Sequence, residues 1–346
     1  MARKTMLAGM ALCALLAACG GGGDGAGIGG NDGGTSGTSG AKDGNGGNGG
    51  ANNGDNTIAP ATLVTTAEPA KYDDPDFANA LDFLNDQRLA CGFGAVRQNE
   101  ALDNSAYAHA DYLSFNVGER NLTPADMNDT ESQDLPAFTG QTPLDRAARQ
   151  GYPASSVREL VGKWHSIYLG VRYAMATAYG PQLLLSGYRD IGLGGMMMLD
   201  GSSPEAMVLD FGIPANQSPQ LLGGRDVATL PCDGQKGLFS MYTPFGPVPV
   251  AGREMATNPL GRPVVAMVRA GQTLAVTSFT LTLHGHAVPA TLLTAASDPN
   301  KLIKPNFVAL IPDQPLQPQA TYMARLVGTN NGAPVDKSWS FTTGDR

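Results

Sequence analysis

The sequence is poor in the residues that carry most enzyme chemistry and most nucleic-acid binding. Its 346 residues include four His, four Cys and two Trp, and no cluster of Lys and Arg occurs after the first four residues. Because the sequence pI is about 5.0 and the net charge is −8, we expect no nucleic-acid partner. Neither a Gly-x-Ser-x-Gly nor a His-Glu-x-x-His motif is present, which excludes two common hydrolase sites.

Apolar runs long enough to cross a bilayer are also missing. The apolar run at residues 6–16 has only about 11 residues, against the roughly 20 that a membrane-spanning helix needs. Arg3 and Lys4 precede this run, and Leu16-Ala17-Ala18-Cys19 follows it. This arrangement predicts a cleavable export signal over residues 1–18.

The sequence around Cys19 resembles the lipobox of bacterial lipoproteins. The resemblance implies that Cys19 becomes the new N-terminus and carries acyl chains such as palmitate, which anchor the protein to a membrane. Gly20 stands where Asp is associated with retention at the inner membrane, so the implied location is the outer membrane of the cell envelope. Which face of that membrane the protein occupies stays open.

Glycine is abundant, but its excess is local. Of the 35 residues from 20 to 54, 18 are Gly, and almost no apolar side chain accompanies them. Such a segment cannot bury enough surface to offset its ordering entropy, so we predict a disordered linker over residues 19–71. Asp74-Pro75 then has the pattern of a helix cap, and apolar residues at helical spacing follow.

Two folded regions are expected after the linker. Residues 72–235 show helical spacing first, with helices expected over 143–150 and 157–178, and then two strands over 191–199 and 206–211. Residues 250–346 contain short β-prone runs separated by Gly, Pro and Asn. The C-terminal Trp339-Ser340-Phe341-Thr342-Thr343 and the Pro-rich segment before it resemble bacterial Ig-like domains.

Cys91 and Cys232 are the only thiols expected in the folded part, because Cys13 lies in the signal and Cys19 is acylated. An isolated pair in an oxidising compartment favours a disulfide. Closing a loop of this length stabilises a protein by about 5 kcal/mol in the chain-entropy model.

A series of motifs in residues 77–212 resembles the CAP superfamily, which includes cysteine-rich secretory proteins, antigen 5 and pathogenesis-related 1, in its bacterial SCP-like form. The motifs are Leu102-x3-Ala106-x2-His109-Ala110-x2-Leu113, Asp129-Thr130-Glu131-Ser132, Thr142-Pro143-x2-Arg146-Ala147, Ile191-Gly192-x-Gly194 and Phe211-Gly212. The resemblance implies an α+β fold class, with a three-layer α-β-α sandwich followed by a small all-β Ig-like sandwich.

The resemblance also implies a cleft with the candidate residues His109, Glu159, Asp129 and Glu131. In many family members this cleft holds two His and two acidic residues, and some members bind Zn or Mg there; imidazole together with carboxylate suits Zn. Here Gly180 stands at the position of the later His, so an imidazole ligand is missing. We expect no cofactor, with a Zn or Mg site as the open alternative. We favour a core His109 that is hydrogen-bonded to Glu159.

These features favour a membrane-anchored envelope lipoprotein whose degenerate CAP domain binds an envelope ligand or a protein partner. Two alternatives stay open. One is a hydrolase or peptidase that uses the cleft around His109, and the other is a carrier of lipids or sterols. We expect binding rather than catalysis, and the sequence identifies no catalytic residue beyond the four candidates.

Overall fold

The computed structural model describes residues 60–116, 127–196, 205–243 and 246–345. The predicted signal peptide, Cys19 and the linker up to residue 59 lie outside the described residues. The helices are α1 (Pro75–Ala90), α2 (Glu100–Asn116), α3 (Pro143–Arg149), α4 (Ile167–Ala174) and α5 (Gly180–Leu184). None of the helices in these ranges has the length and apolar character that crossing a bilayer requires.

Thirteen strands in the described residues form three sheets. The first sheet has the order β1-β3-β4-β2 and is built from β1 (Arg97–Gln98), β2 (Ala154–Trp164), β3 (Asp190–Met196) and β4 (Glu205–Pro214). The second sheet has the order β10-β11-β7-β5 and contains β5 (Ala228–Leu230), β7 (Val264–Met267), β10 (Ala290–Leu293) and β11 (Phe307–Pro312). The third sheet has the order β6-β13-β12-β8-β9 and contains β6 (Gln235–Leu238), β8 (Leu274–Leu283), β9 (His286–Ala287), β12 (Thr321–Asn330) and β13 (Ala333–Thr343).

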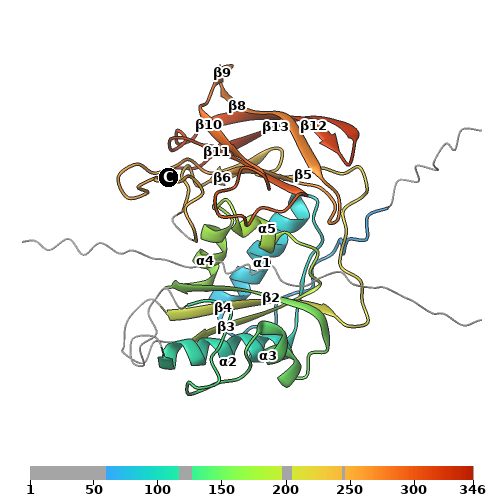
Figure 1. Ribbon diagram of the computed structural model, residues 1–346, viewed down its shortest axis with the longest axis vertical. Helices are drawn as coiled ribbons and strands as arrows, with labels where there is room; N and C mark the ends of the chain where they lie inside the picture. The colour runs from blue at the N-terminus through green and yellow to red at the C-terminus, as the bar shows by residue number, and fades with distance from the viewer. Residues whose placement is uncertain (1–59, 117–126, 197–204, 244–245, 346) are drawn as a thin grey trace, which may run out of the picture.

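The first sheet separates two cores, because side chains alternate between its faces along each strand. On β4, Met207, Leu209 and Phe211 join the large core that contains α1, α4 and α5. Val208, between them, joins a smaller core against α2. In Figure 1, α2 and α3 lie on one side of this sheet, and α1, α4 and α5 lie on the other.

Two glycines allow α2 to lie directly on the sheet. A Cβ on Gly192 would sit 2.0 Å from the carbonyl carbon of Leu102, and a Cβ on Gly194 would sit 2.2 Å from the backbone nitrogen of Tyr107. Because backbone atoms block both positions, only glycine fits there without moving the helix. This close approach brings the inner face of α2, including His109, against β3 and β4.

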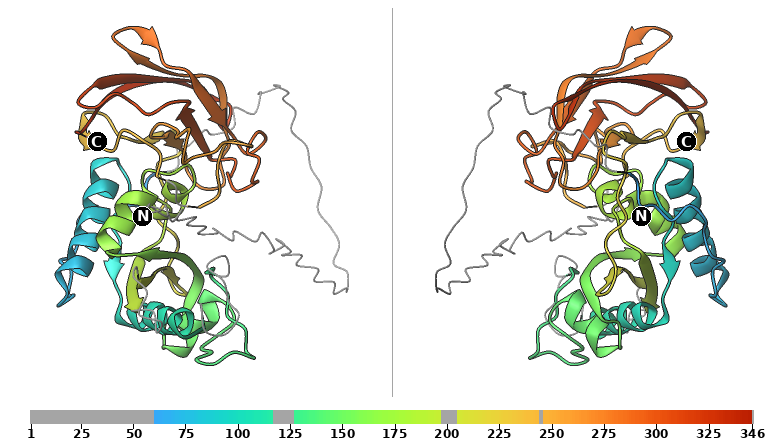
Figure 2. Two further views of the ribbon diagram at one scale, coloured as in Figure 1. Left: turned by 90° about the vertical axis from the view of Figure 1, so that its left-hand side faces the viewer. Right: turned by 90° about the vertical axis from the view of Figure 1, so that its right-hand side faces the viewer.

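The large core continues from the first sheet into the C-terminal region. It contains Leu160 and Trp164 of β2 together with Val265 of β7 and Ile311 of β11. In the side views of Figure 2, α4 and α5 lie between the first sheet and the C-terminal sheets, and α1 runs along one flank beside them. The predicted disulfide is confirmed, since Cys91, the C-cap of α1, is bonded to Cys232, just before β6.

The predicted fold class was wrong. The described residues contain thirteen strands in three sheets and five helices, three of which have eight residues or fewer. The protein is therefore mostly β-sheet, rather than a three-layer α-β-α sandwich with a separate small β domain. The physical reason is that β5 and β6 pair with the C-terminal strands, and that the helices above the first sheet share a core with those strands.

The helix expected over residues 157–178 was also wrong. Residues 154–164 form β2, which pairs with β4 over its whole length, and α4 begins only at Ile167. Leu160 and Val161 are both buried, each on a different face of the sheet. Because apolar residues on both faces of β2 are buried, Val157, Leu160, Val161 and Trp164 recur at i, i+3, i+4 and i+7, which is the spacing of a helix.

Part of the segment assigned to the linker packs against the folded region. Thr62 donates its amide to the carbonyl of Leu221, and Val64 donates its amide to the Gln220 side chain. The Val64 carbonyl in turn accepts from the amide of Ala95. These polar partners explain why residues 60–64, which lack a helical or alternating pattern, still follow a fixed path.

Candidate functional site: a buried histidine and carboxylate cluster

Five side chains from different elements meet beneath α2, and we call them the His109 cluster. They are His109 of α2, Glu131 of the following loop, Arg146 of α3, Glu159 of β2 and Asp210 of β4. Glu159 and Asp210 lie on the same side of the sheet because side chains alternate between the two faces of a strand. Leu160 follows Glu159, and Leu209 and Phe211 flank Asp210; these three point into the large core, so Glu159 and Asp210 point towards α2.

Glu131 fixes one side of the His109 ring. The ring Nδ1 lies 2.9 Å from Oε1 of Glu131. Glu131 also accepts hydrogen bonds from the amide of Thr139 at 2.6 Å, from the Thr139 hydroxyl at 2.9 Å and from the amide of Gly140 at 3.2 Å. Burial raises the pKa of Glu131, but the bonds from His109 and Thr139 outweigh it and the pKa is lowered. Glu131 is therefore a carboxylate, and Nδ1 donates to it.

The other ring nitrogen, Nε2, faces a backbone carbonyl oxygen and a second carboxyl group. Burial and the charge of Arg146 lower the pKa of His109 to about 4, so the ring is neutral at pH 7. Burial raises the pKa of Glu159 well above its usual range, against the opposing charge of Arg146. Oε1 of Glu159 lies 3.3 Å from Nε2 of His109, and it has no hydrogen-bond partner among the described residues. The Asn128 carbonyl oxygen lies 2.9 Å from the same ring nitrogen.

Arg146 supplies the positive charge that the carboxyl groups require. Its Nη2 donates to Oε2 of Glu159 at 2.7 Å and to the carbonyl of Asp129 at 3.0 Å. Its Nη1 donates to the carbonyl of Gly140 at 3.1 Å, and its Nε lies 3.8 Å from Oε1 of Glu131. Burial lowers the pKa of Arg146, but the charges of Glu159 and Asp210 outweigh it and raise the pKa.

Glu159 and Asp210 form a buried carboxyl pair. They are directly opposite each other in the antiparallel pairing of β2 with β4. Asp210 is fully buried, and burial raises its pKa against the opposing charge of Arg146. Two adjacent carboxyl groups in a low-dielectric environment do not both ionise, so one proton is held by the pair.

The cluster is closed to solvent within the part of the chain that the structure describes. The side chains of His109, Glu131, Arg146 and Glu159 have 0% exposure. A metal ion does not fit them, because both ring nitrogens already face protein oxygens and a guanidinium lies among the carboxyl groups. Across the described residues, no group of three or more His, Cys, Asp or Glu is arranged to hold a metal ion.

Three of the four candidate residues from the sequence meet in this cluster. His109, Glu131 and Glu159 are together, and the closer carboxylate to His109 is Glu131 rather than the expected Glu159. Asp129 contributes its backbone carbonyl, which accepts from Arg146, and none of the hydrogen bonds in the cluster involves its carboxyl group.

Two members of the cluster were not predicted from the sequence. Arg146 lies in the Thr142-Pro143-x2-Arg146 motif, and Asp210 directly precedes Phe211-Gly212. A charged residue inside a strand that is otherwise apolar is the signal that could have found Asp210, because such a residue is buried only with a partner.

Comparisons with known proteins identify no family for the chain. No family model matches it, and no curated protein matches it. Among solved structures it is similar to an outer surface protein from Borrelia burgdorferi, with 17% identity over 42% of this chain and 99% of that chain. The TM-score is 0.33, which is too low to support any conclusion about fold or function. Membership of the CAP superfamily stays a prediction.

Proposed function

We propose that this chain is an envelope lipoprotein, tethered to a membrane through acylated Cys19, whose folded part binds a ligand or protein partner without catalysing a reaction. The burial of the His109 cluster is the observation that supports the non-catalytic role. A catalytic acid, base or nucleophile must contact its substrate, whereas the side chains of His109 and Glu159 have no exposed surface.

The cluster serves the fold instead. His109 connects α2 to the loop that holds Glu131, and Arg146 connects α3 to β2 through Glu159. Glu131 and Glu159 both lie against Arg146, and pairing of this kind is the condition under which buried charges are tolerated. Both carboxyl oxygens of Asp210 are buried without a hydrogen-bond partner among the described residues. The cluster therefore fastens α2 and α3 to the first sheet.

The tether rests on the sequence. The lipobox-like Leu16-Ala17-Ala18-Cys19 supplies the site of acylation, and the Gly-rich linker supplies reach. A coil of 35 such residues has a root-mean-square span of roughly 30–35 Å. Loss of Arg3 and Lys4 with the signal would leave 21 basic and 31 acidic residues, a net charge of −10, which would keep the mature chain away from an anionic membrane, so the lipid provides the attachment.

The tether is tested by expressing the full chain in a bacterium that has an outer membrane. We expect the wild type to be found in the membrane fraction, with an acyl mass increment on its N-terminal Cys19. The Cys19→Ser variant should lose both, and the matched Cys13→Ser variant should keep both. Equal membrane association of wild type and Cys19→Ser would contradict lipid anchoring.

The non-catalytic role is tested by offering a panel of peptides and esters to the full chain carrying Cys19→Ser. We expect no hydrolysis above that of the same chain with His109→Gln added. Hydrolysis that disappears in the His109→Gln chain, while its circular dichroism and melting temperature stay unchanged, would identify a hydrolase and refute the proposal.

A further inference from the structure

Two histidines lie at the tip of the β8–β9 hairpin, at the end of the molecule opposite to α2 and α3 (Figure 1). Leu283 pairs with His286, so His284 and Gly285 form the two-residue turn between the strands. Both turn residues have positive φ, 51° at His284 and 80° at Gly285, as a type I′ turn requires. One imidazole therefore belongs to the turn, and the other belongs to the first residue after it.

The ring nitrogens of both histidines are open to a ligand. His284 and His286 are exposed, and neither ring forms a hydrogen bond or an ion pair with another residue in the described part of the chain. His109 differs, because both of its ring nitrogens face protein oxygens in the interior. A ring nitrogen without a protein partner keeps its lone pair for a metal ion or for a hydrogen-bond donor.

A cavity of about 410 Å³ lies beside this hairpin, and both histidines line it. Gln314 and Gln317, in the segment before β12, are the other exposed polar residues of its lining. Nε2 of Gln314 donates to Oδ1 of Asn258 at 3.3 Å, which leaves the carboxamide oxygen of Gln314 for a ligand. No Lys, Arg, Asp or Glu is among the described residues that line the cavity. Its polar groups are therefore imidazoles and carboxamides without a competing charge.

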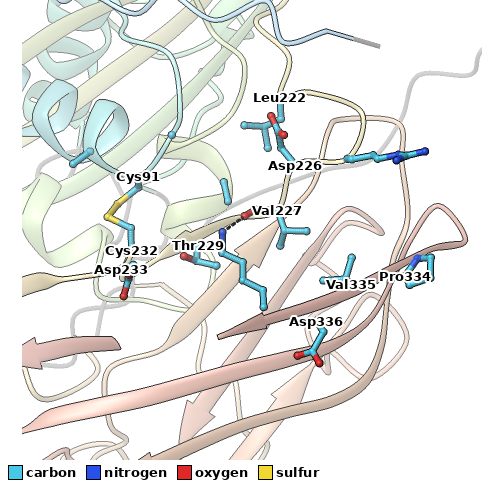
Figure 3. Close-up of a pocket in the computed structure, with 15 residues that line it drawn as sticks. Cys91, Leu222, Asp226, Val227, Thr229, Cys232, Asp233, Pro334, Val335 and Asp336 are labelled. Carbon is cyan, nitrogen blue, oxygen red and sulfur yellow. Dashed lines mark hydrogen bonds between the residues drawn. A yellow bond between two sulfur atoms is a disulfide. The ribbon is translucent and has the colours of Figure 1, made fainter. Parts of the chain in front are cut away.

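The larger cavity of the molecule has a different chemistry. It has a volume of about 700 Å³ and lies beside the Cys91–Cys232 disulfide (Figure 3). Charged residues of both signs line it, namely Arg225, Lys337, Asp226, Asp233 and Asp336. Such a mixture favours neither a cationic nor an anionic ligand, so the uncharged cavity beside the hairpin is the more specific of the two.

The donors of the smaller cavity suit a divalent transition-metal ion. Imidazole binds Zn²⁺, Ni²⁺ and Cu²⁺, and Cu²⁺ binds most tightly of the three in the Irving–Williams order. Zn²⁺ sites in proteins use three or four protein ligands, whereas two imidazoles with oxygen ligands match the tetragonal geometry of Cu²⁺. His284 and His286 are two residues apart and line the same cavity, so both rings can reach one ion.

We propose that His284 and His286 bind one Cu²⁺ ion at the tip of the β8–β9 hairpin. Oxygen atoms of water or of the Gln314 and Gln317 side chains complete the coordination. With only two imidazoles from the protein, the ion is exchangeable rather than a fixed part of the fold. This inference goes beyond the proposed function, because the site lies far from the His109 cluster and does not depend on the membrane tether.

The test is isothermal titration calorimetry with Cu²⁺ on the full chain carrying Cys13→Ser and Cys19→Ser, without a histidine tag. The two substitutions remove the free thiols that would compete for the ion, since Cys91 and Cys232 are bonded to each other. At about pH 7.5, where ordinary imidazole is neutral, we expect one site per chain with a Kd below about 100 µM. Pulsed EPR of the copper-loaded chain should show two imidazole ligands.

Variants locate the ion at the hairpin. His284→Ala and His286→Ala each leave one imidazole, so the second bond is no longer intramolecular. We expect each variant to bind Cu²⁺ at least about tenfold more weakly. His165→Ala is the matched control, because it removes the other exposed histidine of the chain, and it should bind like the parent chain.

Three results would overturn the inference. These are a Kd above about 100 µM, equal binding by either hairpin variant, and a pulsed EPR spectrum without two imidazole ligands. The EPR spectrum is recorded on the unaltered hairpin, so it decides the question even where a variant does not fold. None of these results changes the outcome of the Cys19→Ser fractionation, so failure of this inference and failure of the tether are distinguishable.

Discussion

The His109 cluster and the β8–β9 hairpin differ in how their histidines are satisfied. In the cluster, His109 is bonded to Glu131 and Arg146 is bonded to Glu159 in the interior, and Asp210 lies beside them without a hydrogen-bond partner in the described chain. In the hairpin, His284 and His286 are exposed, and their ring nitrogens have no partner in the described chain. The histidine whose neighbouring motifs indicate chemistry in the sequence thus stabilises this fold, while the histidines open to a ligand lie in a short turn.

The largest difference between the two regions should appear when one polar side chain is replaced. Arg146→Met leaves Glu131, Glu159 and Asp210 buried without their cation. We expect it to lower the free energy of unfolding by about 3–5 kcal/mol, because breaking a buried ion pair strands its partner. Urea denaturation measures this change.

Arg149→Met is the matched control for that measurement. It removes an exposed guanidinium from the last turn of the same helix, where Arg149 lies over the Phe138 ring. We expect this control to change the free energy of unfolding by less than about 1 kcal/mol. Equal losses for Arg146→Met and Arg149→Met would contradict a structural role for the cluster.

The second prediction concerns acid stability. The pKa of His109 is lowered to about 4 in the folded state, whereas an unfolded chain has the usual value of 6.5. The unfolded state therefore binds more protons between these values, and stability falls as the pH falls from 6.5 to about 4. The loss from His109 alone is about 3 kcal/mol.

Comparison with His109→Gln isolates this effect. Its free energy of unfolding should fall less steeply than that of the wild type between pH 6.5 and pH 4. Glu159 has the opposite sign, because its pKa is raised and its contribution is lost as the pH rises above its unfolded value. Parallel curves for wild type and His109→Gln would show that His109 is not held neutral.

The third prediction concerns the approach of α2 to the sheet. Gly192→Ala places a Cβ 2.0 Å from the backbone of Leu102, and we expect a loss of about 1–3 kcal/mol from displacement of the helix. In Gly195→Ala the nearest atom is Sδ of Met207 at 2.6 Å, in a flexible side chain that can move. Thermal unfolding should therefore show a clearly smaller loss for Gly195→Ala.

Several elements could be predicted from local sequence. The Asp74-Pro75 cap, the helix α3 and the strands β3 and β4 follow from capping residues and periodicity. The strand β2 was missed because burial on both faces erases its alternation. The fold class was missed because it depends on β5 and β6 joining the C-terminal strands, a long-range choice with no local signal.

The sequence predicted which His and Glu residues meet in the candidate site, but it did not predict that the whole group is buried and supports the fold. His109, Glu131 and Glu159 carry recognisable motifs, and they do meet. That they meet in the interior depends on Gly192 and Gly194 bringing α2 onto the sheet, and on Arg146 neutralising them. The spacing of His284 and His286 is visible in the sequence, whereas the cavity that both line is not, because residues 314–317, which are distant in the sequence, form part of its lining.

The smallest expected effect on stability is at the β8–β9 hairpin. His286 is exposed, so His286→Ala should change the free energy of unfolding by less than about 0.5 kcal/mol. The same variant should weaken binding of Cu²⁺, which separates binding from stability. Urea denaturation of this variant without Cu²⁺, beside that of Arg146→Met, completes the comparison, and a loss above about 2 kcal/mol would show that His286 has a structural partner.

The most direct measurement is a heteronuclear NMR titration of the ¹⁵N-labelled full chain carrying Cys13→Ser and Cys19→Ser with substoichiometric Cu²⁺. Because a paramagnetic ion broadens the signals of nearby nuclei, the ring signals of His284 and His286 should weaken, while the His109 ring signals stay unchanged. Loss of the His109 ring signals with no change at His284 or His286 would show that the ion enters beneath α2, and would contradict the structural role of the His109 cluster.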